Sequence, residues 1–119
     1  MNSSYDMYSL KTKAYNGDEK AQYKLALCYL IGKGVNKNIM SAFYWLTMSA
    51  KQGYNVAQHE LGKLFDFGKF FERDEQCASF WYGEAEKQGN IEASLDLFSM
   101  NEYDDVFDDE FDDDEDDEY

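Results

Sequence analysis

The sequence contains no proline, and only two of its 119 residues are cysteines and one is a histidine. Without proline, no backbone position is barred from the interior of a helix. No stretch is apolar over the length that a membrane-spanning helix needs, and the first 17 residues lack the apolar core of a signal peptide. We therefore expect a cytoplasmic protein that does not contact a membrane.

The scarcity of cysteine bears on how the fold is stabilised. Cys28 and Cys77 both lie in segments with helical patterning. In a cytosolic protein we expect both to be reduced, buried thiols. A disulfide between them is the alternative.

Residues that support catalysis are equally few. His59-Glu60 matches the start of a helical zinc-protease motif, but the second histidine would have to stand at Lys63. The glycines of 32–34 are too few for a phosphate-binding loop, and Cys28 has no histidine near it in the sequence. The sequence therefore predicts no enzyme, no catalytic residue, no metal site and no cofactor.

Basic residues are missing from one end of the chain. Residues 101–119 hold 13 of the 25 Asp and Glu residues and none of the 11 Lys and Arg residues, so 1–100 carry 12 acidic and 11 basic side chains. A segment this acidic is expected to be a disordered, solvated tail. It also has no glycine, which a calcium-binding helix–loop–helix loop needs for its sharp turn.

What the sequence does contain is an internal repeat of 36 residues. Residues 17–52 and 53–88 are identical at ten positions, where chance would give roughly two. The identical pairs are Gly17/Gly53, Ala21/Ala57, Gln22/Gln58, Leu25/Leu61, Gly32/Gly68, Lys33/Lys69, Ala42/Ala78, Trp45/Trp81, Lys51/Lys87 and Gln52/Gln88. A period of this length is typical of a solenoid, in which each unit buries its apolar face against the next.

Each unit has the pattern of two helices, because apolar and small residues recur at helical spacing. The stripes are Ala21, Leu25, Cys28, Tyr29 and Ala42, Trp45, Leu46, Ser49 in the first unit, then Ala57, Leu61, Leu64, Phe65 and Ala78, Trp81, Tyr82, Ala85 in the second. We expect these stripes to form the core. The small Ala26 and Gly62 should let the paired helix axes approach closely.

The helix boundaries are also marked by residue type. Asn38 and Asp74 occupy the same repeat position and are expected to cap the second helix of each unit. Glycines follow both helices of each unit, where a left-handed residue can end a helix; they are Gly32, Gly53, Gly68 and Gly89. Weaker matches place a further helix over 4–16 and the start of a third unit over 90–100.

These features resemble the Sel-1-like repeat, a family related to the tetratricopeptide repeats. The first unit, "AQYKLALCYLIGKGVNKN…SAFYWLTMSAKQG", has the Gly-x-Gly-Val loop of that family, and the second, "AQHELGKLFDFGKFFERD…CASFWYGEAEKQG", has Phe70-Phe71 in place of Gly-Val. The resemblance covers about 17–98. It implies an all-α fold, a short right-handed α-solenoid of antiparallel helix pairs over 1–100, followed by the tail 101–119.

The resemblance also implies a protein–protein interaction module, an adaptor or scaffold that binds a peptide or protein on its concave helix face. First-helix residues that point away from the core stripe should line that face. The predicted partner-binding residues are Tyr23, Lys24, Leu27, Leu30, His59, Glu60, Lys63 and Phe67, together with Phe107 and Phe111 as apolar anchors in the tail. For Leu27, Leu30 and Phe67, completing the core of a short array is the alternative.

The acidic tail supports a second hypothesis. Small acidic proteins of this repeat type resemble immunity proteins, which neutralise toxins, so the chain is alternatively an inhibitor of a toxin or enzyme with a basic surface. The tail would repel nucleic acid, but it could imitate nucleic acid in a basic groove. In both hypotheses the partner is another protein.

Overall fold

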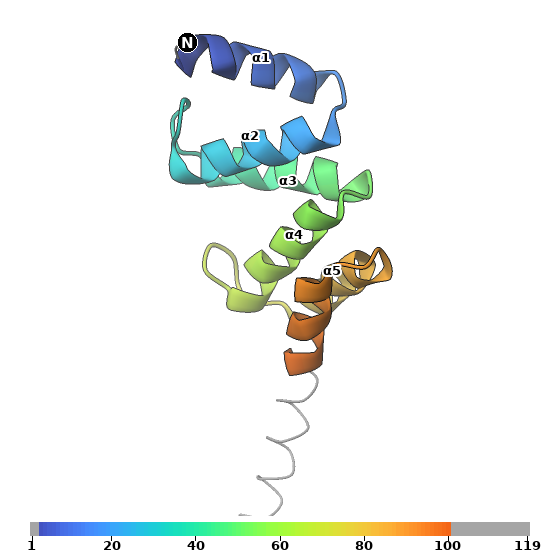
Figure 1. Ribbon diagram of the computed structural model, residues 1–119. Coiled ribbons are helices and arrows are strands. Elements are labelled where there is room, and N and C mark those ends of the chain that lie inside the picture. Colours follow the sequence, from blue (N-terminus) through green and yellow to red (C-terminus); the bar gives the residue numbers. More distant parts are fainter. Residues whose placement is uncertain (1–2, 101–119) are drawn as a thin grey trace, which may run out of the picture.

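The computed structural model describes residues 3–100, with side chains described from Met7 onward. Its helices are α1 (Ser3–Tyr15), α2 (Glu19–Ile31), α3 (Ile39–Lys51), α4 (Asn55–Phe67) and α5 (Glu75–Lys87), followed by a closing helix over 91–100. These described residues contain no strand. Consecutive helices pack against each other and stack into an elongated array (Figure 1). The predicted all-α solenoid is confirmed.

The predicted caps begin the second helix of each unit. Asn38 Oδ1 accepts a hydrogen bond from the backbone N–H of Ser41 at 3.0 Å, and Asp74 Oδ1 accepts one from that of Cys77 at the same distance. The hydrogen bonds from Cys77 lower the pKa of Asp74, because they favour its charged form. These contacts satisfy N–H groups that the helix leaves free.

The glycine ends are confirmed as well. Gly32 has a φ of 78° and donates its N–H to the carbonyl of Cys28 at 2.7 Å, and Gly68 ends α4 with a φ of 64°. Both lie in the left-handed region, which a residue with a Cβ atom enters only with strain.

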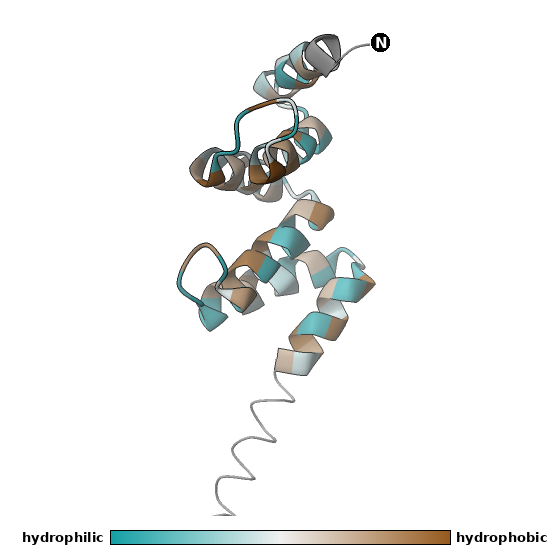
Figure 2. Cartoon of the chain, turned by 90° about the vertical axis from the view of Figure 1, so that its left-hand side faces the viewer, coloured by the Kyte–Doolittle hydropathy of each residue, from teal (hydrophilic) through white to brown (hydrophobic). Residues whose placement is uncertain are grey.

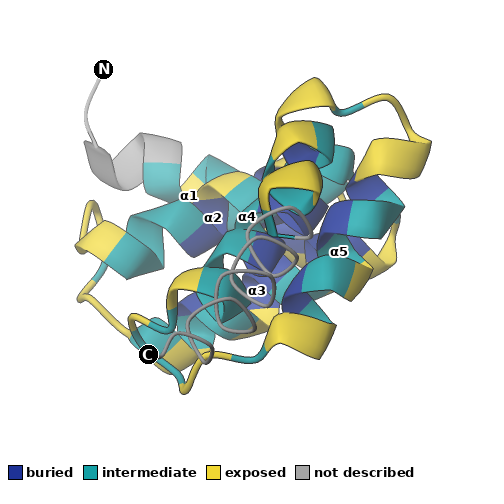
Figure 3. Ribbon diagram, turned by 90° about the horizontal axis from the view of Figure 1, so that it is seen from below, coloured by how far each residue is buried: buried dark blue, intermediate teal, exposed yellow. Residues whose placement is uncertain are grey.

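The buried residues, dark blue in Figure 3, lie on the helix faces that pack against each other. Trp45 is buried and packs edge-on against Tyr15 of α1, with ring centroids 5.0 Å apart. Its repeat partner Trp81 is only half-buried. The position 36 residues after Tyr15 is Lys51, so the second tryptophan has no equivalent aromatic cover. The two tryptophans therefore occupy related sites with different exposure.

The two cysteines differ from expectation in one respect. No disulfide joins them, but neither is buried, because each side chain is partly exposed. The prediction of buried thiols is therefore wrong, whereas the reduced state of both cysteines stays a prediction.

The close approach of α4 and α5 depends on Gly62. A Cβ atom at this position would lie 2.6 Å from Cδ1 of Tyr82, whose ring is fully buried. The Tyr82 hydroxyl donates a hydrogen bond to Asp66 at 3.0 Å, which holds the ring in place. Burial, followed by the charge of Asp66, raises the pKa of Tyr82, so the hydroxyl stays protonated and remains a donor.

Successive hairpins are joined by buried glutamines. Gln22 donates its amide N–H to the carbonyl of Ala14 at 3.1 Å and accepts a hydrogen bond from the amide of Gln52 at 2.7 Å. One unit later, Gln58 donates to the carbonyl of Ala50 at 3.1 Å and accepts from Gln88 at 2.9 Å. We call this repeated arrangement the glutamine ladder. The ladder explains why Gln22/Gln58 and Gln52/Gln88 are identical in the two repeats, since each glutamine makes the same contact in its unit.

We expect Gly62→Ala to destabilise the protein by about 1–3 kcal/mol, because the new methyl group overlaps a buried ring that has no room to move. Gly83→Ala in α5 is the matched control. It meets no atom within 4 Å, so it should stabilise its helix by about 0.5–1 kcal/mol. Urea unfolding followed by circular dichroism measures both. Equal effects of the two substitutions would contradict the proposed close contact.

A second stability prediction concerns the glutamine ladder. Gln58→Leu should cost about 1–3 kcal/mol, because it removes two hydrogen bonds, the buried one to the carbonyl of Ala50 and the one from the amide of Gln88. Gln88→Ala should cost less, because Gln88 is exposed and water can replace it. The same urea titration compares them. A Gln88→Ala variant that loses as much stability as Gln58→Leu would show that burial of the bond is not what matters.

Candidate partner-binding groove

A groove of about 560 Å³ lies between the C-terminal ends of α2 and α4. Its lining combines aliphatic, aromatic and lysine side chains, and it consists of Leu30, Ile31, Lys37, Glu60, Lys63, Leu64, Phe67, Lys69 and Phe70. We call it the basic-apolar groove. The loops that follow α2 and α4 face the viewer in Figure 2 and contain both hydrophobic and hydrophilic residues.

Four of the predicted partner-binding residues meet in this groove: Leu30, Glu60, Lys63 and Phe67. Leu27 lines a narrow apolar crevice beside it, which also contains Leu30. Packing around that crevice leaves Leu27 and Leu30 partly buried, whereas Phe67 is 68% exposed. Of the three residues that were alternatively expected to complete the core, Phe67 therefore has the most surface free for a partner.

Tyr23 and Lys24 lie outside the groove, toward the start of α2. Tyr23 packs edge-on against Tyr54, with ring centroids 5.5 Å apart, and burial is the main cause that raises the pKa of its hydroxyl. Lys24 lines a separate hollow between α1 and α2. The predicted tail anchors Phe107 and Phe111 lie outside the residues that the structure describes.

The structure corrects the orientation predicted for His59. Its side chain is not on an open wall but only 6% exposed, because the closing helix packs over it. Nε2 lies 2.7 Å from Oδ2 of Asp96, Nδ1 lies 3.7 Å from Oε1 of Glu92, and the ring lies beside Tyr82. His59 therefore serves to dock the closing helix.

Charge in the groove is mostly positive. Lys37, Lys63 and Lys69 line it together with a single carboxylate, Glu60, which lies 3.3 Å from the ammonium group of Lys63. The ammonium group of Lys69 lies 5.3 Å from the centre of the Phe70 ring, within the range of a cation–π contact. The groove thus offers positive charge directly beside apolar surface.

Sequence reasoning missed five lining residues: Leu64, which it assigned to the core, and four from the helix ends and loops, Ile31, Lys37, Lys69 and Phe70. One feature of the sequence could have indicated Phe70: Phe70-Phe71 replaces the Gly-Val of the first unit, so this loop differs between the units. Phe71 packs against Phe43, with ring centroids 4.9 Å apart, and Phe70 lines the groove.

The loop after α4 is held by Arg73. Its guanidinium donates to the backbone carbonyl of Asp66 at 2.6 Å and to the carboxylate of the same residue at 3.0 Å. Asp66 also accepts the hydroxyl of Tyr82. Phe70 and Lys69 therefore extend from a loop that is tied to the core.

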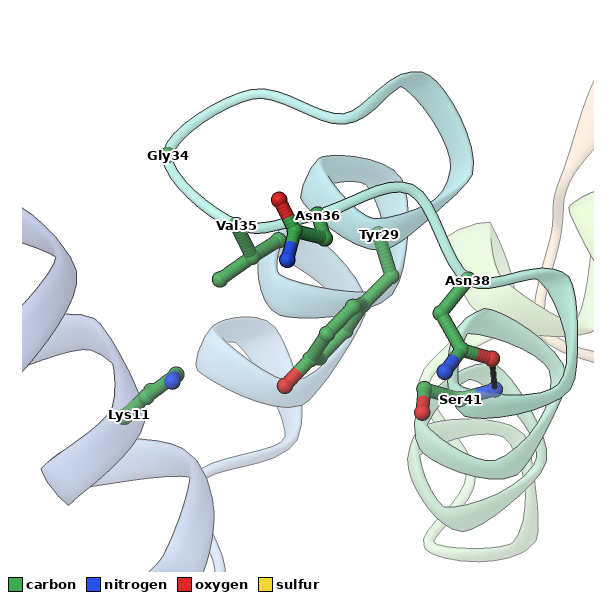
Figure 4. Close-up of a pocket in the computed structure, with 7 residues that line it drawn as sticks. All are labelled: Lys11, Tyr29, Gly34, Val35, Asn36, Asn38 and Ser41. Atoms are coloured by element: carbon green, nitrogen blue, oxygen red, sulfur yellow. Dashed lines mark hydrogen bonds between the residues drawn. The ribbon is translucent and has the colours of Figure 1, made fainter.

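A larger hollow of about 710 Å³ separates α1 from the loop after α2 (Figure 4). It is lined mainly by polar groups, among them Lys11, Tyr29 and Asn38. The side-chain oxygen of Asn38 is already engaged in capping α3 at Ser41, which the dashed line in Figure 4 marks. This hollow has fewer apolar contacts to offer than the basic-apolar groove.

Within residues 3–100, no three His, Cys, Asp or Glu side chains are grouped so that they could hold a metal ion. In that same part of the chain, no helix is both long and apolar enough to cross a bilayer.

The chain belongs to the Sel1 repeat family, because the model of that family matches residues 19–54 and 55–90. Both matches begin two residues after the repeats that we read from the sequence. Sel1 repeat proteins are generally protein-interaction modules, and their fold is typically a non-catalytic, protein-binding scaffold.

Two solved structures are similar to this chain. A Sel1 repeat protein from Oxalobacter formigenes is 36% identical, with a TM-score of 0.74, over 77% of this chain and 69% of its own. The c5321 protein, a protective antigen present in uropathogenic Escherichia coli strains that displays an SLR fold, is 29% identical, with a TM-score of 0.73. That match covers 81% of this chain but only 21% of c5321. No curated protein matches the chain.

We expect His59→Ala to loosen the closing helix, because it removes the bond to Asp96 and leaves a void beside Tyr82. The loss of stability should be about 1–3 kcal/mol. Amide hydrogen exchange over 91–100 should accelerate more than exchange in α2. Lys63→Ala, one turn further along α4 and partly exposed, is the control and should leave both measurements nearly unchanged. Unchanged exchange over 91–100 in the His59 variant would contradict the docking role.

Proposed function

We propose that this chain is a non-catalytic protein-binding module whose basic-apolar groove binds an acidic peptide segment with apolar anchor residues. The observation that carries this proposal is the exposure of large apolar side chains among lysines. Ile31 and Phe67 are each 68% exposed, and both lie in the groove beside Lys63 and Lys69. Exposed apolar side chains that cluster in a hollow are typical of a binding surface.

The lysines favour one kind of partner. Three lysines against one glutamate give the groove a positive field that attracts carboxylates and opposes basic segments. The apolar side chains add binding free energy that charge alone does not provide. Burying Phe67 and Phe70 under a partner's aromatic or aliphatic residue removes apolar area from water. An acidic segment with one or two aromatic residues satisfies both demands.

The groove is also well placed for an adaptor. It lies at the ends of α2 and α4, whereas α5 carries other exposed side chains, such as Phe80, outside the groove. A second partner could therefore use another face of the array without competing for the groove. This adaptor role is part of the proposal.

The tail supports a second candidate function, an inhibitor of the immunity-protein type. Its 13 acidic side chains without a basic one suit a partner with a cationic surface. The two candidates differ in the charge of the partner, because the groove selects an acidic segment and the tail selects a basic surface. Raised salt should weaken both interactions.

The groove can be tested with a random peptide library displayed on phage and selected on the full chain. We expect the selected peptides to be rich in Asp and Glu around Phe, Trp or Leu. Phe67→Ala or Lys63→Glu should weaken a selected peptide about ten-fold or more, equivalent to at least about 1.4 kcal/mol. Fluorescence anisotropy with the labelled peptide measures this change.

Matched controls are available on α5. Phe80 and Lys87 are exposed residues of the same types outside the groove, so Phe80→Ala and Lys87→Glu should leave the affinity unchanged. Basic peptides among the selected sequences, or peptides whose binding depends on Phe80 rather than Phe67, would overturn the assignment of this groove.

A further inference from the structure

We propose that residues 101–119 of this same chain bind in the basic-apolar groove and compete with an external partner for it. This inference rests on the proposed function, because it assigns a regulatory ligand to the same groove. Three features support it: the chemistry of the tail, the point from which the tail leaves the described fold, and the length of chain available.

The tail has the chemistry that the groove selects. Val106, Phe107 and Phe111 stand in the sequence "DDVFDDEFDDD", and every charged residue from 101 to 119 is acidic. The apolar residues can contact Ile31 and Phe67 while the flanking carboxylates face the lysines. No other segment of the chain combines aromatic residues with negative charge at this density.

The tail begins next to α4, which forms one wall of the groove. Met100, the last described residue, packs against the same buried cluster as Phe65 of α4. The residue 36 positions before Met100 is Leu64, which lines the groove. The closing helix therefore repeats the placement of α4 one unit further on, and its C-terminal end lies toward the same side of the array.

The connection is also long enough. An extended chain of seven residues, from Met100 to Phe107, spans at most about 25 Å. The closing helix packs against α4 through Asp96 and His59, so the groove on the other side of α4 lies about one to two helix spacings away, roughly 10–20 Å. Attachment to the same molecule gives the tail an effective concentration in the millimolar range at the groove. Even a weak tail–groove contact would then occupy the groove most of the time when no partner is present.

The consequence is a threshold for partner binding. A weak external ligand fails to displace the tail, whereas a ligand with stronger apolar anchors succeeds. Because the contact involves lysines and carboxylates, raised salt weakens both the binding of the tail and the binding of an acidic competitor. Replacing Phe107 and Phe111, however, weakens only the binding of the tail to the groove, so these two residues are the ones to substitute in the test.

The test uses a fluorescein-labelled synthetic peptide of sequence 101–119, measured by anisotropy against two full-length proteins. One is the unaltered chain and the other carries Phe107→Ser and Phe111→Ser, which leave the charge unchanged. We expect the labelled peptide to bind the doubly substituted chain about ten-fold or more tightly than the unaltered chain, because its own tail no longer competes. Adding Lys63→Glu should abolish the difference.

A control peptide with both phenylalanines replaced by serine should bind the doubly substituted chain at least about ten-fold more weakly than the natural tail peptide. Equal binding of the two peptides would mean that charge alone attracts the tail, and would overturn the proposal. Equal binding of the natural peptide to both proteins would also overturn it. In that case peptides selected from the phage library would still bind through Phe67, so the proposed function would stand while the self-binding of the tail would not.

A photocrosslink shows whether the occupant is the molecule's own tail. With p-benzoylphenylalanine at position 67 of the full chain, irradiation should join position 67 to residues 101–119 within a single monomer, as read by gel and mass spectrometry. The same group at position 80, exposed on α5 but outside the groove, should give no such product. Crosslinked dimers in place of crosslinked monomers would overturn binding within one molecule.

Discussion

The hydrogen bonds of Gln22 and Gln58 are the constraint on which the rest of the structure depends. Each buried amide ties the first turn of one hairpin to a carbonyl at the end of the preceding helix. Both glutamine side chains are buried, and a buried amide without a partner is costly, so the spacing of consecutive hairpins is closely restricted. This spacing brings the ends of α2 and α4 together, and the basic-apolar groove exists only because both helices end on the same side.

The ladder stops after the second unit, and other residues take over at the end of the array. The position 36 residues after Gln58 is Ser94, which cannot reach as far as glutamine. The closing helix is instead held by the bond between His59 and Asp96 and by Asn90, which donates to Asn55 at 2.9 Å. The first-helix position of His59 therefore contacts the following unit, just as Tyr23, 36 residues earlier, packs against Tyr54.

The repeat explains both what sequence reasoning predicts and what it misses. Helix ends, caps and the small residue at Gly62 depend on neighbours within one unit, so their roles can be read from a 36-residue pattern. The burial of His59 depends on a carboxylate 37 residues away, in a helix that belongs to an incomplete unit. Trp81 is more exposed than Trp45 because Tyr15, which covers Trp45, precedes the two repeats and its counterpart 36 residues later is Lys51. The repeat pattern alone therefore does not predict features that depend on contacts between units, or on positions where the sequence differs from the repeat.

The same reasoning explains where the groove comes from. In the first unit, Gly34 takes a left-handed φ of 78°, whereas within the described residues no residue other than glycine has a positive φ, so Phe70 follows a different backbone path. Phe71 returns the loop to the core through Phe43, and Phe70 is left facing the groove. The repeated residues thus form the regularly packed helices. The loop after α4, whose sequence differs from that of the first unit, forms part of the proposed binding surface. Specificity in this chain is expected to lie where the two units differ, because a surface made only of identical positions would offer a partner the same contacts twice.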